Sequence, residues 1–224
     1  MPGLNPAAAT GLLVLAGCVP VAGPAVRPAT GWADPDGWDD PPGCVVVLPA
    51  VVPPEIGLTA ARLEEAVAGR LSGRIDLVLG PGRRDALSRR LGLDLGHPVD
   101  RRRFAALSGC RHAAATRAWG GRAWAVVWSE TRVGLDLAIL RLTDGRRLWQ
   151  ARGEGRRGDG GVPVTPLSAA VAAGLAARAA LDDTAMASAL DDALRSALRG
   201  LPDFRDPQAF ASRNSRVRPL SSRK

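Results

Sequence analysis

The stretch LAILRLTDGRRLWQARGEG, residues 137–155, carries the strongest short-range structural signal in this chain. Runs in which apolar and polar residues alternate stand on both sides of Asp144-Gly145. Asp-Gly between two such runs is typical of a β-hairpin, because both residues tolerate the backbone angles of a tight turn. The stretch therefore predicts two strands joined by a turn over residues 143–145.

The same period of two extends upstream to His112. We expect four consecutive strands, joined by Gly120-Gly121, by a bend near Arg132 and by the turn at Asp144-Gly145. Their sequences are HAAATRAW (112–119), RAWAVVWSETR (122–132), VGLDLAILRL (133–142) and RRLWQARGE (146–154).

The residues before His112 alternate between strand and helix signals. CVVVLPAVV (44–52) predicts a buried strand, and RIDLVL (74–79) predicts a second one. Between them, Thr59 is placed to cap a helix. Two more helices follow, one that ends at Gly92 and one that is capped by Asp100. The opening order is therefore β-α-β-α-α.

The residues after the hairpin predict a loop and two helices. GEGRRGDGGVPV (153–164) is rich in glycine and predicts a loop, after which Thr165-Pro166 supplies the start of a helix. The final helix repeats an apolar residue at every fourth position, at Met186, Leu190, Leu194 and Leu198. We predict an α/β fold with one domain over residues 44–202. Its elements follow the order β-α-β-α-α-β-β-β-β-α-α, in a mixed sheet with helices packed on it.

The charge of the chain is strongly positive. A formal net charge of +8 over 224 residues raises nucleic acid as a partner. Of the 30 basic residues, however, only Lys224 is a lysine, so part of the basicity follows from a compositional bias toward arginine. Stacking on bases needs aromatic side chains, and the chain has no Tyr and 3 Phe. We therefore expect no nucleic-acid partner.

A short apolar segment, residues 7–16, stands near the start of the sequence. It has the length of a signal-peptide core and is too short to span a bilayer. It leads into Leu15-Ala16-Gly17-Cys18, which resembles the lipobox of bacterial lipoprotein precursors. The resemblance implies a signal peptide over residues 1–17 and lipidation of Cys18, while an ordinary buried cysteine is the alternative. Val19 in place of Asp favours passage to the outer membrane.

Two segments lack any periodicity. Residues 18–43 are rich in Pro, Gly and Asp, and predict a tether between the lipidated cysteine and the domain. Residues 203–224 are polar and basic, and predict a disordered tail. We expect this tail to make at most a weak, salt-sensitive contact with an acidic envelope surface.

No constellation of catalytic residues stands out in the sequence. His97 and His112, the latter close to Cys110, lack a paired metal-binding motif, so we expect no metal and no cofactor. LVLGPGRRD (77–85) loosely resembles a phosphate-binding loop. It lacks the third glycine of the dinucleotide motif and the Gly-Lys-Ser/Thr of a P-loop. We therefore predict that the chain is not an enzyme.

The lipobox, the tether, the apolar strand VVVLPAVV and the hairpin LTDGRRLW (142–149) together resemble a group of periplasmic lipoprotein domains. The group contains the CsgG lipoproteins of curli secretion, the LpoB-type activators of penicillin-binding proteins and the TolB N-terminal domain. The resemblance covers residues 44–202 and implies an α/β sandwich that acts through protein contacts. The tight turns expected at Gly120-Gly121 and Asp144-Gly145 argue against the long inserted hairpins of a CsgG-type pore.

These patterns favour a non-enzymatic lipoprotein on the periplasmic face of the outer membrane, serving as an accessory or assembly factor of a cell-envelope machine. Its partners would be the membrane, through the lipid, and an envelope protein; homo-oligomerisation stays open. The alternative is a periplasmic ligand-binding protein or enzyme that uses the glycine-rich loops near Gly80–Gly82 and Gly153–Gly161.

The three cysteines allow one further prediction. Lipidation of Cys18 leaves Cys44 and Cys110 as a pair in an oxidising compartment. Cys44 opens the first predicted strand, and Cys110 stands just before the strand at His112. If these strands are parallel neighbours, their starting ends lie one strand spacing apart, close to what a disulfide needs. We predict a Cys44–Cys110 disulfide, with two unconnected cysteines as the alternative.

Overall fold

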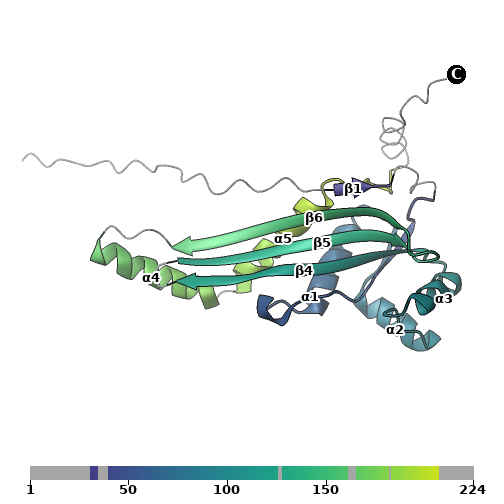
Figure 1. Ribbon diagram of the computed structural model, residues 1–224, viewed down its shortest axis with the longest axis horizontal. Coiled ribbons are helices and arrows are strands. Elements are labelled where there is room, and N and C mark those ends of the chain that lie inside the picture. Colours follow the sequence, from purple (N-terminus) through teal and green to yellow (C-terminus); the bar gives the residue numbers. More distant parts are fainter. Residues whose placement is uncertain (1–30, 35–39, 126–127, 161–164, 182, 207–224) are drawn as a thin grey trace, which may run out of the picture.

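Six strands form one mixed sheet in the computed structural model, which describes residues 31–34, 40–125, 128–160, 165–181 and 183–206 (Figure 1). The strands are β1 (Gly31–Ala33), β2 (Cys44–Val47), β3 (Leu77–Leu79), β4 (His112–Ala125), β5 (Trp128–Arg141) and β6 (Arg147–Gly160). The helices are the short η1 (Pro54–Ile56), α1 (Ala60–Leu71), α2 (Pro81–Leu91), α3 (Pro98–Ser108), α4 (Pro166–Leu181) and α5 (Asp183–Leu198). The predicted α/β fold with a mixed sheet is confirmed.

The strand order across the sheet is β1-β6-β5-β4-β2-β3. β4, β5 and β6 have 14 residues each and form an antiparallel meander, while β2 runs parallel to both β3 and β4. β5 and β6 are the hairpin predicted from residues 137–155, and Gly145 takes a φ of 74° in its turn. The parallel pairing of the strands at Cys44 and His112 is also confirmed.

The expected division of residues 112–142 into three strands is wrong. Gly120 pairs with Val133 and Gly121 pairs with Arg132, so these glycines lie within β4 and the bend near Arg132 lies within β5. Gly120 has a φ of 126°, and a Cβ there would overlap the Arg132 carbonyl. Glycine is thus required by the close approach of the neighbouring backbone rather than by a turn. Gly120-Gly121 therefore forms no tight turn, and of the two turns expected to argue against a CsgG-type pore only Asp144-Gly145 is present.

The predicted glycine-rich loop is largely a strand, because residues 153–160 continue β6. A Cβ on Gly153 would overlap the carbonyl of Ala193, and one on Gly155 would overlap the carbonyl of Ala189. Both carbonyls belong to α5. The glycines therefore let a helix lie directly on the backbone of the sheet, and residues 161–164 lie outside the described residues.

Parts of the predicted tether and tail join the domain. Residues 31–33 form β1, paired antiparallel with residues 149–151 of β6. At the other end, the backbone N–H of Phe204 donates to the carbonyl of Arg74 (2.8 Å), so packing continues beyond Pro202. The signal peptide, Cys18 and the tail from residue 207 onward lie outside the described residues.

Two apolar clusters lie on the two faces of the sheet. α1 and α5 cover one face, where Met186, Leu190, Leu194 and Leu198 are buried as predicted. α2 and α3 contribute to the second cluster, around Phe104, on the other face beside β2 and β4. α3 begins at Pro98 after His97, so the predicted cap at Asp100 is wrong; proline at the first helical position sets the start.

Candidate functional site

The meander β4–β6 has two different faces. Side chains at even positions of β4 and odd positions of β5 and β6 point toward α5 and the main core. The opposite side chains form a surface that we call the open face. In register, its cross-strand rows are Ala115–Ala138–Gln150, Arg117–Asp136–Arg152, Trp119–Gly134–Glu154 and Gly121–Arg132–Arg156.

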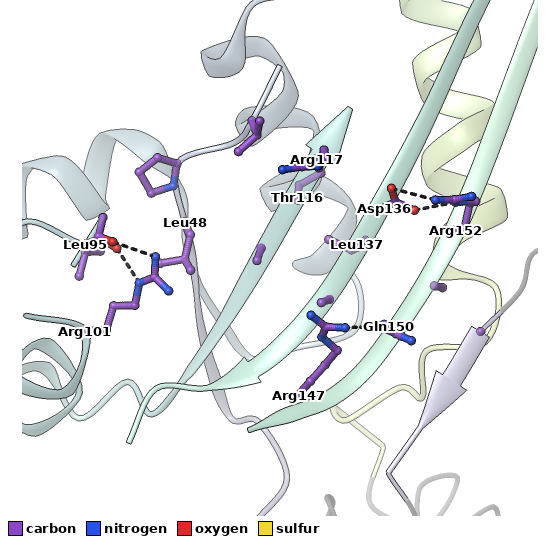
Figure 2. A pocket seen from close by; sticks show the side chains of 17 residues that line it. Leu48, Leu95, Arg101, Thr116, Arg117, Asp136, Leu137, Arg147, Gln150 and Arg152 are labelled. Carbon is purple, nitrogen blue, oxygen red and sulfur yellow. Dashed lines mark hydrogen bonds and ion pairs between the residues drawn. The ribbon is translucent and has the colours of Figure 1, made fainter. Parts of the chain in front are cut away.

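The row Arg117–Asp136–Arg152 places one carboxylate between two guanidinium groups (Figure 2). Arg152 donates from Nε to Oδ1 of Asp136 (2.7 Å) and from Nη2 to Oδ2 (3.2 Å). The side chain of Arg117 makes no hydrogen bond or ion pair to any residue in the described part of the chain. Its exposed guanidinium is therefore available to a ligand.

The next row is built around an aromatic ring. Trp119 lies against the backbone of Gly134, where a Cβ would overlap the indole. The guanidinium carbons of Arg132 and Arg152 each lie 5.4 Å from the ring centroid, which is the range of cation–π attraction. Although burial opposes ionisation, hydrogen bonds from Arg132 and Arg156 hold the pKa of Glu154 below its usual range. The row is thus charged, and its side chains are held by ion pairs and cation–π contacts.

A groove of about 670 Å³ lies on the open face, over the first two rows. Its walls come from β1, from the segment after β2 and from the loop before α3. The residues that line it are Gly31, Leu48, Pro49, Val51, Leu95, Gly96, Arg101, Ala115, Thr116, Arg117, Asp136, Leu137, Ala138, Arg147, Gln150, Ala151 and Arg152. Four arginines against one carboxylate leave an excess of three positive charges.

Two of these arginines are fixed by neighbouring acceptors (Figure 2). Arg101 donates to the backbone carbonyls of Leu95 (2.6 Å) and Gly96 (3.2 Å), and Arg147 donates to the side-chain oxygen of Gln150 (2.6 Å). Neither is neutralised by a carboxylate among the described residues. Guanidinium groups stay protonated and offer planar pairs of donors, so the groove is suited to binding carboxylates or phosphates.

The predicted disulfide is present in the structure. Cys44 and Cys110 are bonded, with their Cα atoms 5.1 Å apart. The bond joins β2 to the residues just before β4, at the end of the sheet that helices cover on both faces. It belongs to the scaffold of the groove rather than to its lining.

The histidines and the glycine loops are not brought together as a site. Exposed His97 lies 3.5 Å from Asp94, whereas Nε2 of buried His112 lies 3.9 Å from the carboxylate of Asp40. Burial lowers the pKa of His112. Among the residues that the structure describes, no group of three or more His, Cys, Asp or Glu side chains is arranged to hold a metal.

The glycine-rich segments near Gly80–Gly82 and Gly153–Gly161, the ligand sites of the alternative hypothesis, have structural roles instead. Gly80 is the residue before the first turn of α2, and a Cβ there would lie 3.2 Å from the Cβ of Ala68. Residues 153–160 are a strand. Sequence reasoning missed the groove, because its charges become a row only in the register of β4, β5 and β6. The available signal was polar residues such as Asp136 and Arg152 at alternate positions of apolar strands.

The sequence matches no protein-family model and none of the curated proteins to which it was compared. In structure, the chain is similar to lipoprotein GNA1162 from Neisseria meningitidis, with a TM-score of 0.43 and 14% identity over 62% of this chain and 99% of that one. It is also similar to PelC, a dodecamer from Paraburkholderia phytofirmans, with a TM-score of 0.39 and 18% identity over 67% of this chain and 91% of that one.

The LpoB C-terminal domain from Salmonella enterica is a third similar structure, with a TM-score of 0.35 and 17% identity over 50% of this chain and 80% of that one. The helices within the described residues include none with the length and hydropathy to cross a bilayer.

Proposed function

We propose that this chain is a lipid-anchored protein of the bacterial cell envelope that binds an acidic segment of a partner protein in the groove. The observation that carries the proposal is the excess of three positive charges in a groove on the open face. Positive charges that lie close together repel one another, and a bound anion relieves that repulsion. This surface therefore favours an acidic ligand.

The shape of the groove favours an extended segment over a compact small molecule. Arg117, Arg147 and Arg152 are exposed along it, whereas small-molecule sites enclose most of their ligand. Arg117 supplies an uncommitted donor, and Arg101 and Arg147 supply donors that are already oriented. Such pre-orientation reduces the entropy lost on binding.

The cysteines support two parts of this proposal, the lipid anchor and the oxidising compartment. The lipobox ending at Cys18 supports lipidation, and Val19 in place of Asp supports passage to the outer membrane. The Cys44–Cys110 disulfide fits an oxidising compartment such as the periplasm. Together with the groove, these features support a role as an accessory or assembly factor of an envelope machine, on the periplasmic face of the outer membrane.

The anchor is tested by labelling cells with an alkyne fatty acid. The wild-type chain should incorporate the label and sediment with membranes. Cys18→Ala should lose the label and leave the membrane fraction. Equal labelling and equal sedimentation of the two proteins would contradict lipidation at this cysteine.

The groove is tested by placing a photo-crosslinking amino acid at position 147, in the groove, and at position 199, an exposed arginine at the end of α5. The proposal expects an adduct from position 147 in intact cells that position 199 does not give. Mass spectrometry should map the adduct to an acidic segment of an envelope protein. The same adducts from both positions, or none from position 147, would overturn it.

A further inference from the structure

β6 has an outer edge that is only partly paired. β5 pairs with β6 along residues 147–160, whereas on the opposite edge β1 pairs only with residues 149–151 (Figure 1). From residue 152 to residue 160, the described residues supply no strand on that side. An edge of this length is a template for another strand, because its outward N–H and C=O groups need partners.

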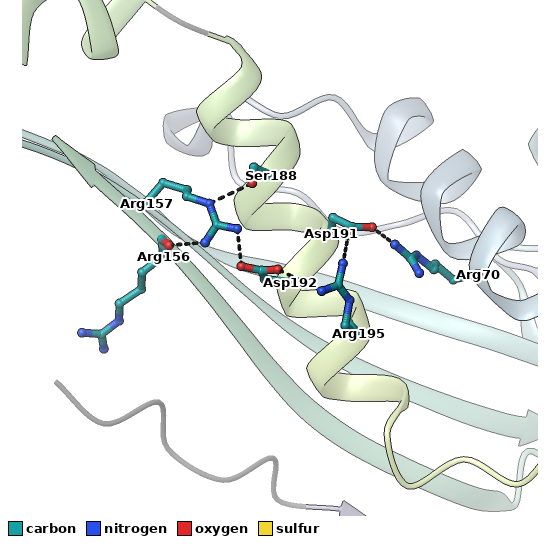
Figure 3. Close-up of polar contacts among 7 residues, drawn as sticks. All are labelled: Arg70, Arg156, Arg157, Ser188, Asp191, Asp192 and Arg195. Carbon is teal, nitrogen blue, oxygen red and sulfur yellow. Dashed lines mark hydrogen bonds and ion pairs between the residues drawn. The ribbon is translucent and has the colours of Figure 1, made fainter. Parts of the chain in front are cut away.

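The register identifies which backbone groups face outward. The N–H of Asp34 donates to the carbonyl of Leu148 (2.9 Å), so even-numbered residues of β6 point their backbone groups toward the β1 side. Between residues 153 and 159 these residues are Glu154, Arg156 and Gly158. The carbonyl of Arg156 accepts from Nη1 of Arg157 (2.8 Å; Figure 3). The three N–H groups have no acceptor among the described residues.

The sequence before β1 is a poor partner for this edge. Paired residues of β1 and β6 have numbers that sum to 182, as in Gly31 with Ala151. A continued ladder would set Pro28 opposite Glu154 and Pro24 opposite Gly158, at positions where the incoming residue must donate an N–H. Proline has none. The sequence upstream of β1 therefore lacks two of the N–H donors that a continued ladder would need.

The charges along this edge of β6 determine which kind of strand could bind to it. Residues 152–158 carry three arginines, Arg152, Arg156 and Arg157, and one carboxylate, that of Glu154. From neighbouring elements, Asp136 pairs with Arg152 and Asp192 pairs with Arg157. Two copies of this edge side by side would bring six arginines together with two glutamates, which disfavours a second copy. A strand with carboxylates at alternate positions would place them on the open face, beside Arg152 and Arg156.

We propose that the free edge of β6 at residues 152–158 binds its partner by strand addition, taking an extended segment with acidic side chains at alternate positions. This inference rests on the proposed function, because it names how the acidic segment is held. One end of the added strand would reach Arg152, which also lines the groove. Backbone hydrogen bonds would supply affinity, and the arginines would supply selectivity.

The test uses the full mature chain and a fluorescent ten-residue peptide of alternating valine and glutamate, with binding followed by anisotropy. Arg156→Pro removes an outward N–H, and Arg156→Ala removes the same side chain but keeps that N–H. We expect Arg156→Pro to bind at least about tenfold more weakly than Arg156→Ala, since both the hydrogen bond and the approach of the strand are lost. Equal affinities of the two variants would overturn strand addition.

Further variants make the outcomes distinct. If Arg156→Pro does not fold, Gly158→Pro against Gly158→Ala asks the same question. A loss with Arg117→Glu but none with Arg156→Pro would keep the groove and reject the edge, and the reverse would keep the edge and reject the groove. Absence of binding by the wild-type chain would reject both. A wild-type dimer that Arg156→Pro converts to a monomer would assign the edge to a second copy.

Discussion

The two faces of the β4–β6 meander are built from the same three strands, but one is covered by α5 and the other carries charged side chains. On the α5 side, Gly153 and Gly155 have no side chain and the backbone of α5 lies against them. On the open face, the same strand carries Arg152, Glu154 and Arg156, which are held in ion pairs; Arg152 is exposed to solvent, and the other two are half-buried. Stability is therefore concentrated on the face that α5 covers, and the open face is available for recognition.

The largest effect should follow from adding a side chain on the α5 side. Gly155→Val would drive its Cβ into the Ala189 carbonyl and separate α5 from the sheet, at a cost of about 4 kcal/mol in the free energy of unfolding. Gly121→Val is the matched control, because nothing lies within 4 Å of a Cβ there. Chemical denaturation should show a loss under about 1 kcal/mol for the control. Equal losses of unfolding free energy in Gly155→Val and Gly121→Val would show that the two faces tolerate an added side chain equally, and would contradict this prediction.

Removing the disulfide should have the next largest effect. Replacing Cys44 and Cys110 with alanine opens a loop with a sequence separation of 66 residues. The change should cost about 3 kcal/mol and lower Tm by on the order of 10 °C. Neither cysteine lines the groove, so peptide affinity at a temperature where the variant is folded should stay within about twofold. A large loss of affinity in the folded variant would show that the groove depends on this end of the sheet.

A smaller, pH-dependent effect is expected from His112. Burial lowers the pKa of His112 in the folded chain, whereas the unfolded chain binds its proton near pH 6.5. The unfolded state then binds more protons, so the free energy of unfolding should fall as pH drops through about 6.5. It should stop falling below the folded pKa. Thermal unfolding from pH 7.5 to 5 should show a flatter profile for His112→Gln, and parallel profiles would contradict the assignment.

The smallest effect on stability should come from the carboxylate of the groove. Asp136→Asn breaks an exposed pair with Arg152 and should cost under about 1 kcal/mol. It also removes the one negative charge of the groove, so affinity for an acidic peptide should rise by about threefold. Asp183→Asn, which changes an exposed aspartate paired with Arg122, is the control. Unchanged or weaker binding by Asp136→Asn would argue against a role for the groove's charge.

Local signals predicted most of the fold because they act over a few residues. Asp144-Gly145 marks a turn wherever it stands between alternating runs, and Met186 to Leu198 mark the buried face of a helix. The disulfide was predicted because strand starts share an edge in a parallel pair. The meaning of Gly120, Gly153 and Gly155 was missed, since a glycine in a turn and a glycine beneath another backbone look alike in sequence.

The groove could not be predicted for a related reason. Arg117, Asp136 and Arg152 are separated in sequence, and only the register of three strands sets them side by side. Shifting one strand by a single residue would send each of these side chains to the opposite face. Likewise, the free edge of β6 depends on where β1 pairs, and the sequence placed residues 31–33 in the tether.

We propose that the arginines of the groove bind an acidic partner because of where they lie, and not because the whole chain is basic. A titration of the alternating valine–glutamate peptide with the wild-type chain, Arg117→Glu and Arg199→Glu at low salt tests this proposal. Both variants change the net charge equally, but only Arg117 lies in the groove. We expect Arg117→Glu to bind the peptide about tenfold more weakly, and the affinity of Arg199→Glu to change by less than about twofold. Equal affinities of the two variants would contradict it.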